Sequence, residues 1–236
     1  MTVLGVVVAL EIEARGLVKK SVIQGGATCL PEGILLEISG NGAEHGRLAA
    51  ETLIKDGATS LLTWGSAGGL HPILLPGSLI IPEKVLLPNK IGFAVDVAWH
   101  RRLFTYLSEH FKLHTGPLFQ SPTILTSPLE KGKLFRQHGA IAVDTESAAV
   151  ADVARQAQVP FVAIRAVSDP ADMIMPASAL AATDEHGRLR LLRLLKSLAR
   201  HPEEFSLLFR LGRNFYAAMN TLASVRRITG KKLMAP

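Results

Sequence analysis

The first two thirds of the chain alternate short apolar runs with stretches in which apolar residues recur at helical spacing. The continuous apolar run Val3–Ala9 predicts a strand buried on both faces. Further strands are predicted at Leu35–Ile38, Ser60–Thr63, Ser78–Leu87, Ile141–Val143 and Phe161–Val167, and helices at Ala43–Lys55, Val95–Phe111 and Thr145–Gln156. Gly65–Gly69 is too rich in glycine to continue a regular element, so we expect the third strand to end before it. This alternation predicts an α/β fold, with a mixed, largely parallel twisted sheet flanked by helices.

Residues 187–225 have a different pattern. Four leucines recur at helical spacing with basic residues among them: Leu189, Leu192, Leu195 and Leu198, with Arg190, Arg193, Lys196 and Arg200. Pro202 suits the first turn of a second helix, whose apolar stripe contains Phe205, Leu208, Phe209, Phe215, Met219 and Leu222. We see no linker and no internal repeat. We therefore expect one domain, with an α/β body over residues 1–184 and a C-terminal amphipathic helical extension over residues 185–236.

Composition narrows the class of protein. Hydrophobic residues make up 48% and charged residues 19% of the 236 residues, which excludes a disordered chain and allows a sizeable core. Cys29 is the single cysteine, which excludes a disulfide framework and a cysteine-based zinc module, and favours a reducing, cytoplasmic compartment. No apolar run reaches the roughly 18–20 residues of a membrane span. The first residues lack the basic segment of a signal peptide.

The net charge of +6 is unevenly distributed. Residues 1–185 contain 15 basic and 18 acidic residues, whereas residues 186–236 contain 11 basic and 2 acidic ones. A partner recognised by positive charge is therefore expected at the C-terminal extension. Its aromatic residues, among them Phe205, Phe209 and Phe215, fall at helical spacing, which favours packing over base stacking. No nucleic-acid partner is expected.

Polar residues follow four of the predicted strands, and ligands of α/β sheets bind at the carboxyl ends of the strands. The four segments are Glu11–Glu13, Thr63–Leu70, Val143–Ala149 and Arg165–Asp169. Each also has a purely structural interpretation. Acidic residues cap helices, glycines allow tight turns, and an Asp before a proline forms an Asx turn.

Three carboxylates in these segments can do chemistry. A partly desolvated Glu13 can act as a general base toward water. Glu146 precedes a helix rich in small residues, so we expect it to be partly buried. A sugar diol would supply the hydrogen-bond donors that a buried carboxylate needs. Asp169, at the end of the last predicted strand, is a candidate general acid.

The order of these motifs is itself informative. A Glu after the first strand is followed by GSAGGL, then DTESAA, then RAVSD. This order resembles the purine/uridine nucleoside phosphorylase superfamily, and within it the nucleosidase branch of methylthioadenosine/S-adenosylhomocysteine nucleosidases and futalosine hydrolases. The resemblance extends over about residues 3–172, and VDTESAAVADVARQAQVPFVAIRAVSD is its most specific stretch. The C-terminal sequence DEHGRLRLLRLLKSLARHPEEFSLLFRLGRNFYAAMNTL is most similar to the tail of the hopanoid-associated phosphorylase group.

The resemblance implies cleavage of the N-glycosidic bond of a purine nucleoside, with no metal or other cofactor. Asp169 matches the general acid at purine N7, Glu146 matches the residue that binds the ribose 2′- and 3′-hydroxyls, and Glu13 matches the residue that activates water. Further substrate-binding residues that the resemblance implies are Ser66, Gly68, Leu125, Thr145, Arg165 and Ser168.

Two positions depart from the family pattern. Thr145 stands where many hydrolases carry Met. Leu125 lies in Ser121–Thr126, where adenine-type hydrolases place an aromatic residue.

The nucleophile is either water or phosphate. Family phosphorylases often show R-x-G-S at the glycine loop, whereas this chain reads Thr63-Trp64-Gly65-Ser66. Glu13 would also repel a phosphate dianion. Arg15 and Arg47 are candidate substitutes for the absent arginine, because phosphate capture needs cationic partners. We therefore expect hydrolysis, with phosphate as a co-substrate in the alternative.

The hopanoid resemblance implies adenosylhopane as the substrate and contact between the enzyme and the inner membrane surface. The alternatives are a methylthioadenosine/S-adenosylhomocysteine or futalosine nucleosidase, a nucleoside phosphorylase, and a catalytically silent nucleoside-binding protein. Because family members are homodimers or larger assemblies, a homo-oligomer is expected.

Overall fold

The computed structural model describes residues 2–18, 26–89, 91–182 and 191–235. Its strands are β1 (Leu4–Val8), β2 (Thr28–Leu30), β3 (Ile34–Ile38), β4 (Ser60–Gly69), β5 (Leu79–Ile80), β6 (Lys84–Leu86), β7 (Gly92–Ala94), β8 (Leu113–His114), β9 (Leu118–Gln120), β10 (Ala142–Asp144) and β11 (Phe161–Asp169). Its helices are α1 (Glu11–Ala14), α2 (Ala43–Lys55), α3 (Val97–Ser108), α4 (Pro128–His138), α5 (Ser147–Gln156), α6 (Ala177–Ala182), α7 (Leu191–Arg200) and α8 (Phe205–Thr229), with the 3-10 helices η1 (Pro202–Glu204) and η2 (Gly230–Leu233).

β4 is the central strand of one mixed sheet. It pairs in parallel with β1 and β11, and antiparallel with β10. The strand order is β2-β3-β1-β4-β10-β9-β6-β7, with β11 attached to β4 and followed outward by β5 and β8. Parallel pairs outnumber antiparallel ones, and this sheet confirms the predicted α/β fold.

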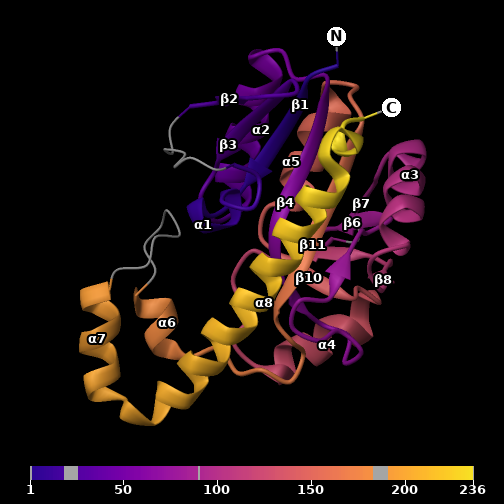
Figure 1. Cartoon of the computed structure of the whole chain (residues 1–236). Helices are drawn as coiled ribbons and strands as arrows, with labels where there is room; N and C mark the ends of the chain where they lie inside the picture. The colour runs from indigo at the N-terminus through magenta and orange to yellow at the C-terminus, as the bar shows by residue number, and fades with distance from the viewer. Residues whose placement is uncertain (1, 19–25, 90, 183–190, 236) are drawn as a thin grey trace.

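Helices cover both faces of this sheet (Figure 1). α2 and α5 pack against each other and against the sheet, whereas α8 crosses the opposite face over β4 and β11. The core between the layers is aliphatic and includes Val6, Leu62 and Ile164, all fully buried. Because β1, β4 and β11 are parallel, their carboxyl ends meet at one edge of the sheet. The candidate polar segments after these strands therefore come together.

β4 runs without a break through the glycine-rich segment, so the prediction that this strand ends before Gly65 is wrong. Gly65 to Gly68 stay paired with β11, and Gly68 and Gly69 pair with Val143 and Ala142 of β10. Neighbouring strands on both sides thus hold the backbone extended, although glycine has little intrinsic preference for a strand.

The predicted strand Ser78–Leu87 is two short strands, β5 and β6. Pro82 lies between them and has no N–H for a ladder. β5 joins β11 and β8, whereas β6 joins β7 and β9.

Several short elements were not predicted from the sequence pattern: β2, β7, β8, β9, α4 and α6. The predicted helix Thr145–Gln156 is α5, which begins at Ser147 rather than Thr145. Thr145 and Glu146 therefore lie in the turn before α5.

The two predicted C-terminal helices are α7 and α8, separated by η1, which begins at Pro202. In Figure 1, α6, α7 and the first turns of α8 project from the body. The Glu204 carboxylate accepts hydrogen bonds from the backbone N–H groups of Ala177 (3.1 Å) and Ser178 (2.9 Å). This contact holds the first turn of α6 against the start of α8.

The apolar stripe of α8 divides in two. Phe205 and Phe209 are exposed, whereas Leu222, further along the helix, is fully buried. Only the second half of α8 therefore belongs to the core. The predicted positions Leu189 and Arg190, and the predicted boundary between residues 184 and 185, lie outside the described residues. Within the described part of the chain, no helix has the length and hydrophobicity to span a bilayer.

Candidate active site

Glu13 lies in α1, directly after β1, and its side chain is buried. Its Oε1 accepts hydrogen bonds from the backbone N–H (2.7 Å) and the hydroxyl (2.6 Å) of Ser66. Its Oε2 accepts one from the N–H of Leu10 (3.2 Å). Burial raises the pKa of Glu13, although the bonds from Ser66 and the charge of Arg165 oppose this shift. A buried carboxylate with a raised pKa is suited to accept a proton from water.

Glu146 lies in the turn between β10 and α5 and is also buried. It accepts hydrogen bonds from the N–H of Gly42 (2.7 Å), just before α2, and from the hydroxyl of Thr145. Burial and the neighbouring Asp144 carboxylate raise the pKa of Glu146 to about 7. Near neutral pH this carboxylate therefore changes charge, and its ionised form can accept hydrogen bonds from hydroxyl groups.

Arg165 of β11 is a buried cation that links the carboxylates. It forms an ion pair with Asp144 (Nη2 to Oδ2, 2.8 Å) and donates a hydrogen bond to the Ser147 hydroxyl (2.9 Å). Asp144 also accepts a bond from the N–H of Ser147 (3.2 Å), so it both stabilises the start of α5 and pairs with arginine. The charge of Arg165 lowers the pKa of Glu13 and of Glu146, against the stronger effect of burial. Arg165 thereby offsets part of the repulsion among the carboxylates.

Asp169 is the last residue of β11 and is buried. Its Oδ1 accepts a hydrogen bond from the Ser168 hydroxyl (3.0 Å), and its Oδ2 forms an ion pair with Nζ of Lys131 (2.8 Å). Lys131 belongs to α4, which is far from Asp169 in the sequence and lies outside the motifs that carry the family resemblance. Both oxygens of Asp169 are therefore held in place.

The carboxylates approach glycine backbone closely. A Cβ atom at Gly65 would lie 2.7 Å from Oε2 of Glu13, and one at Gly68 would lie 3.0 Å from Oδ2 of Asp169. In α2, a Cβ atom at Gly46 would lie 3.0 Å from the Cβ of Glu146, in the turn before α5. The glycine segment of β4 therefore makes room for the acidic side chains that surround it.

The structure gathers the predicted site residues at one edge of the sheet. They are Glu13, Ser66, Gly68, Thr145, Glu146, Arg165, Ser168 and Asp169. Leu125 packs against a small apolar cluster that includes Val143, and Val143 lies against Gly68. Sequence reasoning missed Lys131 and Gly46. The signal for α4 was present, because Ser127 and Glu130 form a capping box at its start.

The two arginines named as candidate phosphate ligands do not join this site. Arg47 pairs with Glu44 and Glu51 on an exposed face of α2. Arg15 is exposed at the end of α1. Among the described residues, the cations that form ion pairs with carboxylates of the site are Arg165 and Lys131. Each already has its carboxylate partner.

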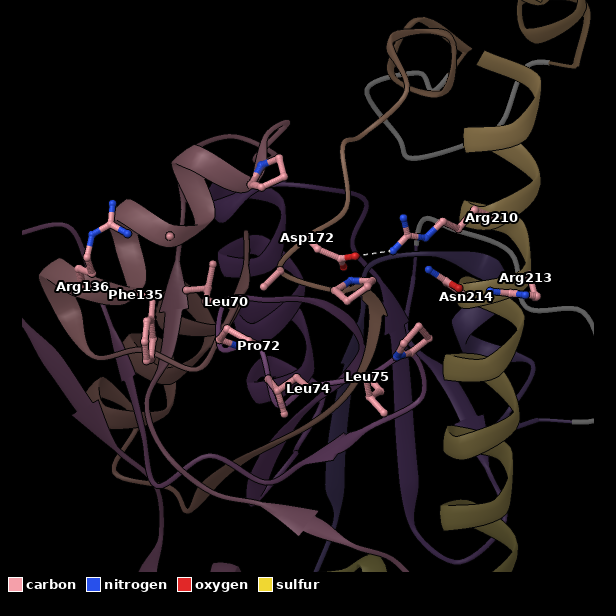
Figure 2. A pocket seen from close by; sticks show the side chains of 15 residues that line it. Leu70, Pro72, Leu74, Leu75, Phe135, Arg136, Asp172, Arg210, Arg213 and Asn214 are labelled. Atoms are coloured by element: carbon pink, nitrogen blue, oxygen red, sulfur yellow. Dashed lines mark hydrogen bonds and ion pairs between the residues drawn. The ribbon is translucent and has the colours of Figure 1, made fainter. Parts of the chain in front are cut away.

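A cavity of about 570 Å³ lies next to this site, between α4, the loop after β4 and α8 (Figure 2). Leu70 and Phe135 contribute apolar walls, and Asp172 pairs with Arg210 (2.7 Å) at one side. Pro170, which follows Asp169, also lines it. Glu13, Glu146 and Asp169 do not line this cavity, so it adjoins the carboxylate cluster without containing it.

Comparison with known proteins places the chain in a family. The model described as "Phosphorylase superfamily" matches residues 31–200. The chain belongs to the phosphorylase superfamily. Its sequence is 30% identical to that of a 5′-methylthioadenosine/S-adenosylhomocysteine nucleosidase of Baumannia cicadellinicola subsp. Homalodisca coagulata, over 73% of this chain and 88% of that protein. It is 31% identical to the nucleosidase of the same name from Buchnera aphidicola subsp. Baizongia pistaciae, over 48% of this chain and 52% of that protein.

Solved structures show the same phosphorylase superfamily fold. The 5′-methylthioadenosine/S-adenosylhomocysteine nucleosidase of Helicobacter pylori superposes with a TM-score of 0.67 at 18% identity, covering 96% of this chain and 98% of that chain. The futalosine hydrolase of Helicobacter pylori strain 26695 superposes with a TM-score of 0.68 at 18% identity, covering 96% and 97%. At these identities the likeness concerns the fold.

Proposed function

We propose that this protein hydrolyses the N-glycosidic bond of a purine nucleoside and releases the free base, adenine in the preferred substrate. The observation that carries the proposal is the grouping of three buried carboxylates, Glu13, Glu146 and Asp169. Glu13 and Asp169 lie against the glycine segment of β4, and the charge of Arg165 acts on both Glu13 and Glu146. A protein that only binds nucleosides needs neither a general base nor a general acid. The nucleosidase relatives support the same conclusion.

In the proposed reaction, the bond between C1′ of the ribose and N9 of the base breaks, and its electron pair goes to the purine. Asp169 donates a proton to N7, which makes the purine a better leaving group. Glu146 binds the 2′- and 3′-hydroxyls, and its negative charge stabilises the positive charge that develops on the ribose. Glu13 takes a proton from the water molecule whose oxygen bonds to C1′. Water completes the balance, and no cofactor is needed.

The charges of the site support water over phosphate as the nucleophile. Capture of a phosphate dianion needs cations that are available to bind it, most often arginine. Arg165 and Lys131 are already paired with carboxylates, and Arg47 is paired on the surface of α2. The nearby Glu13 carboxylate would repel phosphate. A phosphorylase would need a cationic site that these contacts do not supply.

Substrate profiling tests the proposal. The purified protein would be offered adenosine, methylthioadenosine, S-adenosylhomocysteine, futalosine and adenosylhopane, each with and without phosphate, and the free base would be measured. We expect adenine release that does not depend on phosphate. Release only with phosphate, and with a ribose 1-phosphate product, would identify a phosphorylase. Release from none of them would favour a nucleoside-binding protein.

For the 5′ substituent of the nucleoside, our proposal is a bulky apolar group such as the hopane skeleton of adenosylhopane. Phe205 and Phe209, at the projecting start of α8, support it because these exposed side chains offer apolar surface in a segment rich in basic residues. A thioether or futalosine-type substituent is the alternative, which the names of the relatives support. The same profiling separates them, because the true substrate should have the highest kcat/KM. The proposed enzyme acts as a homodimer or larger assembly.

The proposal for a lipid-linked substrate includes contact with an anionic membrane surface through the C-terminal extension. Basic residues near such a surface contribute about 1 kcal/mol each and are screened by salt. Phe205→Glu/Phe209→Glu removes two exposed apolar side chains and adds negative charge, so it should abolish co-sedimentation with anionic vesicles at low salt. Val97→Glu, at an exposed residue of α3, should not. Removing the whole extension is no test, because Leu222 and Val225 of α8 are core residues. Failure of the intact protein to bind such vesicles at any salt concentration would contradict the membrane contact.

The raised pKa values predict a pH dependence of activity and of stability. The mechanism needs ionised Glu146, whose pKa is about 7, and ionised Glu13, whose pKa is also raised. We therefore expect kcat/KM to rise with pH through about 7. A flat pH profile of kcat/KM would contradict the role assigned to Glu146.

The folded state favours the neutral carboxyl of Glu146, so the free energy of unfolding should fall as pH rises from 4.5, the ordinary pKa, to about 7. Thermal melting between pH 5 and 8 measures this fall, and Glu146→Gln should lessen it.

A further inference from the structure

Lys131 is a buried lysine to which the proposed reaction assigns no role. Its side chain is 1% exposed, although lysine is among the residues least often buried. It lies one turn into α4, whose start is fixed by the capping box of Ser127 and Glu130. A buried ammonium group is stable only where it is paired and hydrogen-bonded, so its partners show what it holds in place.

Among the described residues, the partners of the Lys131 ammonium group all belong to one short segment of chain. Nζ lies 2.8 Å from Oδ2 of Asp169, 2.9 Å from the carbonyl oxygen of Pro170, 3.2 Å from that of Asp169 and 3.5 Å from that of Met173. The three N–H groups of the ammonium are thus directed at the end of β11 and the turn after it. Lys131 connects α4 to this turn.

The contact also fixes the carboxylate itself. Oδ1 of Asp169 is held by the Ser168 hydroxyl and Oδ2 by Lys131, and Oδ2 lies against the backbone of Gly68. With both oxygens held and β4 behind them, the carboxyl group has little freedom to turn away from a ligand. A charged partner also stabilises the carboxylate form more strongly than a neutral hydrogen bond does.

We propose that Lys131 is the positioning residue for Asp169 in leaving-group departure, an inference that rests on the proposed nucleosidase function. During base release the O–H bond of the Asp169 carboxyl group breaks and the N7–H bond forms, while the C1′–N9 electron pair goes to the purine. The carboxylate left on Asp169 then has the ammonium group of Lys131 beside it, because Nζ lies 2.8 Å from Oδ2. Lys131 therefore stabilises the charge that develops on Asp169 as the base departs.

A purely structural role is the competing explanation, in which Lys131 only joins α4 to the turn after β11. The leaving group separates the two roles. Adenine needs protonation at N7 to depart, whereas 4-nitrophenolate departs without protonation. A residue that acts through Asp169 should matter for adenine and hardly for nitrophenolate. A residue that only maintains the fold should matter equally for both.

The test compares Lys131→Met with Lys133→Met, a control at an exposed lysine of the same helix. The substrates are an adenine nucleoside and the 4-nitrophenyl β-riboside with the same 5′ substituent. For Lys131→Met we expect kcat for adenine release to fall about a hundredfold, as for loss of general acid catalysis, with KM within about threefold and nitrophenolate release nearly unchanged. Lys133→Met should match the wild type with both substrates. Equal losses with both leaving groups, or no loss with adenine, would overturn the inference.

A double variant gives a second, independent readout. If Lys131 acts through Asp169, Lys131→Met should cost little more activity in an Asp169→Asn background. Additive losses would contradict the proposal. If Lys131→Met does not fold, Lys131→Gln, which removes the charge and keeps a donor toward the carbonyl groups, takes its place in both tests. A wild-type protein that releases no base from any nucleoside would instead refute the proposed function.

Discussion

Asp169→Asn should slow adenine release by about a hundredfold or more, because the amide cannot donate a proton to N7 as a carboxylic acid does. Asn keeps nearly the same shape and can still accept the hydrogen bond from Ser168. The loss should therefore fall on kcat rather than on KM. Single-turnover measurement of free adenine at saturating nucleoside would isolate this step.

The matched control is Asp172→Asn, three residues further along the chain. Asp172 is an exposed partner of Arg210 at the neighbouring cavity, and the proposed reaction does not use it. Asp172→Asn should change kcat by less than about threefold, as expected for loss of a surface ion pair. Removing one member of the buried pair with Lys131 also costs stability, about 3–5 kcal/mol for such pairs. Both variants should therefore be assayed well below their melting temperatures. Wild-type kcat in Asp169→Asn would refute its role as the acid.

Glu13→Gln should reduce hydrolysis by about 10²- to 10⁴-fold, because the amide cannot take a proton from the attacking water. Gln can still accept the hydrogen bonds from Ser66 at its oxygen, so the position of β4 should be preserved. Binding of an unreactive nucleoside analogue should therefore persist while turnover is lost. Isothermal titration with the analogue, together with turnover measurements, would show this separation.

Glu11→Gln provides the control for this second prediction. Glu11 lies in the same short helix as Glu13 but is exposed, and the proposed reaction does not use it. Its variant should keep turnover within about twofold of the wild type, as is usual for an exposed surface position. If Glu13→Gln hydrolysed the nucleoside at the wild-type rate, another group would have to activate the water.

The sequence predicted the parts of the fold in which local pattern and tertiary context agree. Val3–Ala9 and Phe161–Val167 read as buried strands and are β1 and β11, because parallel strands inside the sheet need apolar residues on both faces. Gly65–Gly69 was misjudged because its extended backbone comes from pairing with β10 and β11, which no local pattern reveals. Pro82, in contrast, was a local signal that divides the predicted strand Ser78–Leu87.

The candidate site shows the same division. Glu13, Glu146 and Asp169 could be predicted because each lies at the end of a strand. The ends of β1 and β11 meet because both strands are parallel to β4, whereas β10, before Glu146, reaches the same segment of β4 from the opposite direction. Lys131 could not, because its function depends on where α4 packs and on contacts with a segment nearly forty residues away in the sequence. The closeness of Gly46 to the turn before α5 likewise depends on how α2 packs against α5.

The most direct test of the proposed hydrolysis follows the oxygen of the attacking water. The protein would be incubated with its best adenine nucleoside in phosphate-free buffer made with ¹⁸O-labelled water, and the sugar product would be analysed by mass spectrometry at early times, with a correction for exchange at C1. We expect one equivalent of free adenine for each sugar, and a sugar that carries one ¹⁸O atom at C1 beyond that correction. Adenine release that requires added phosphate, with ribose 1-phosphate as the product, would contradict hydrolysis.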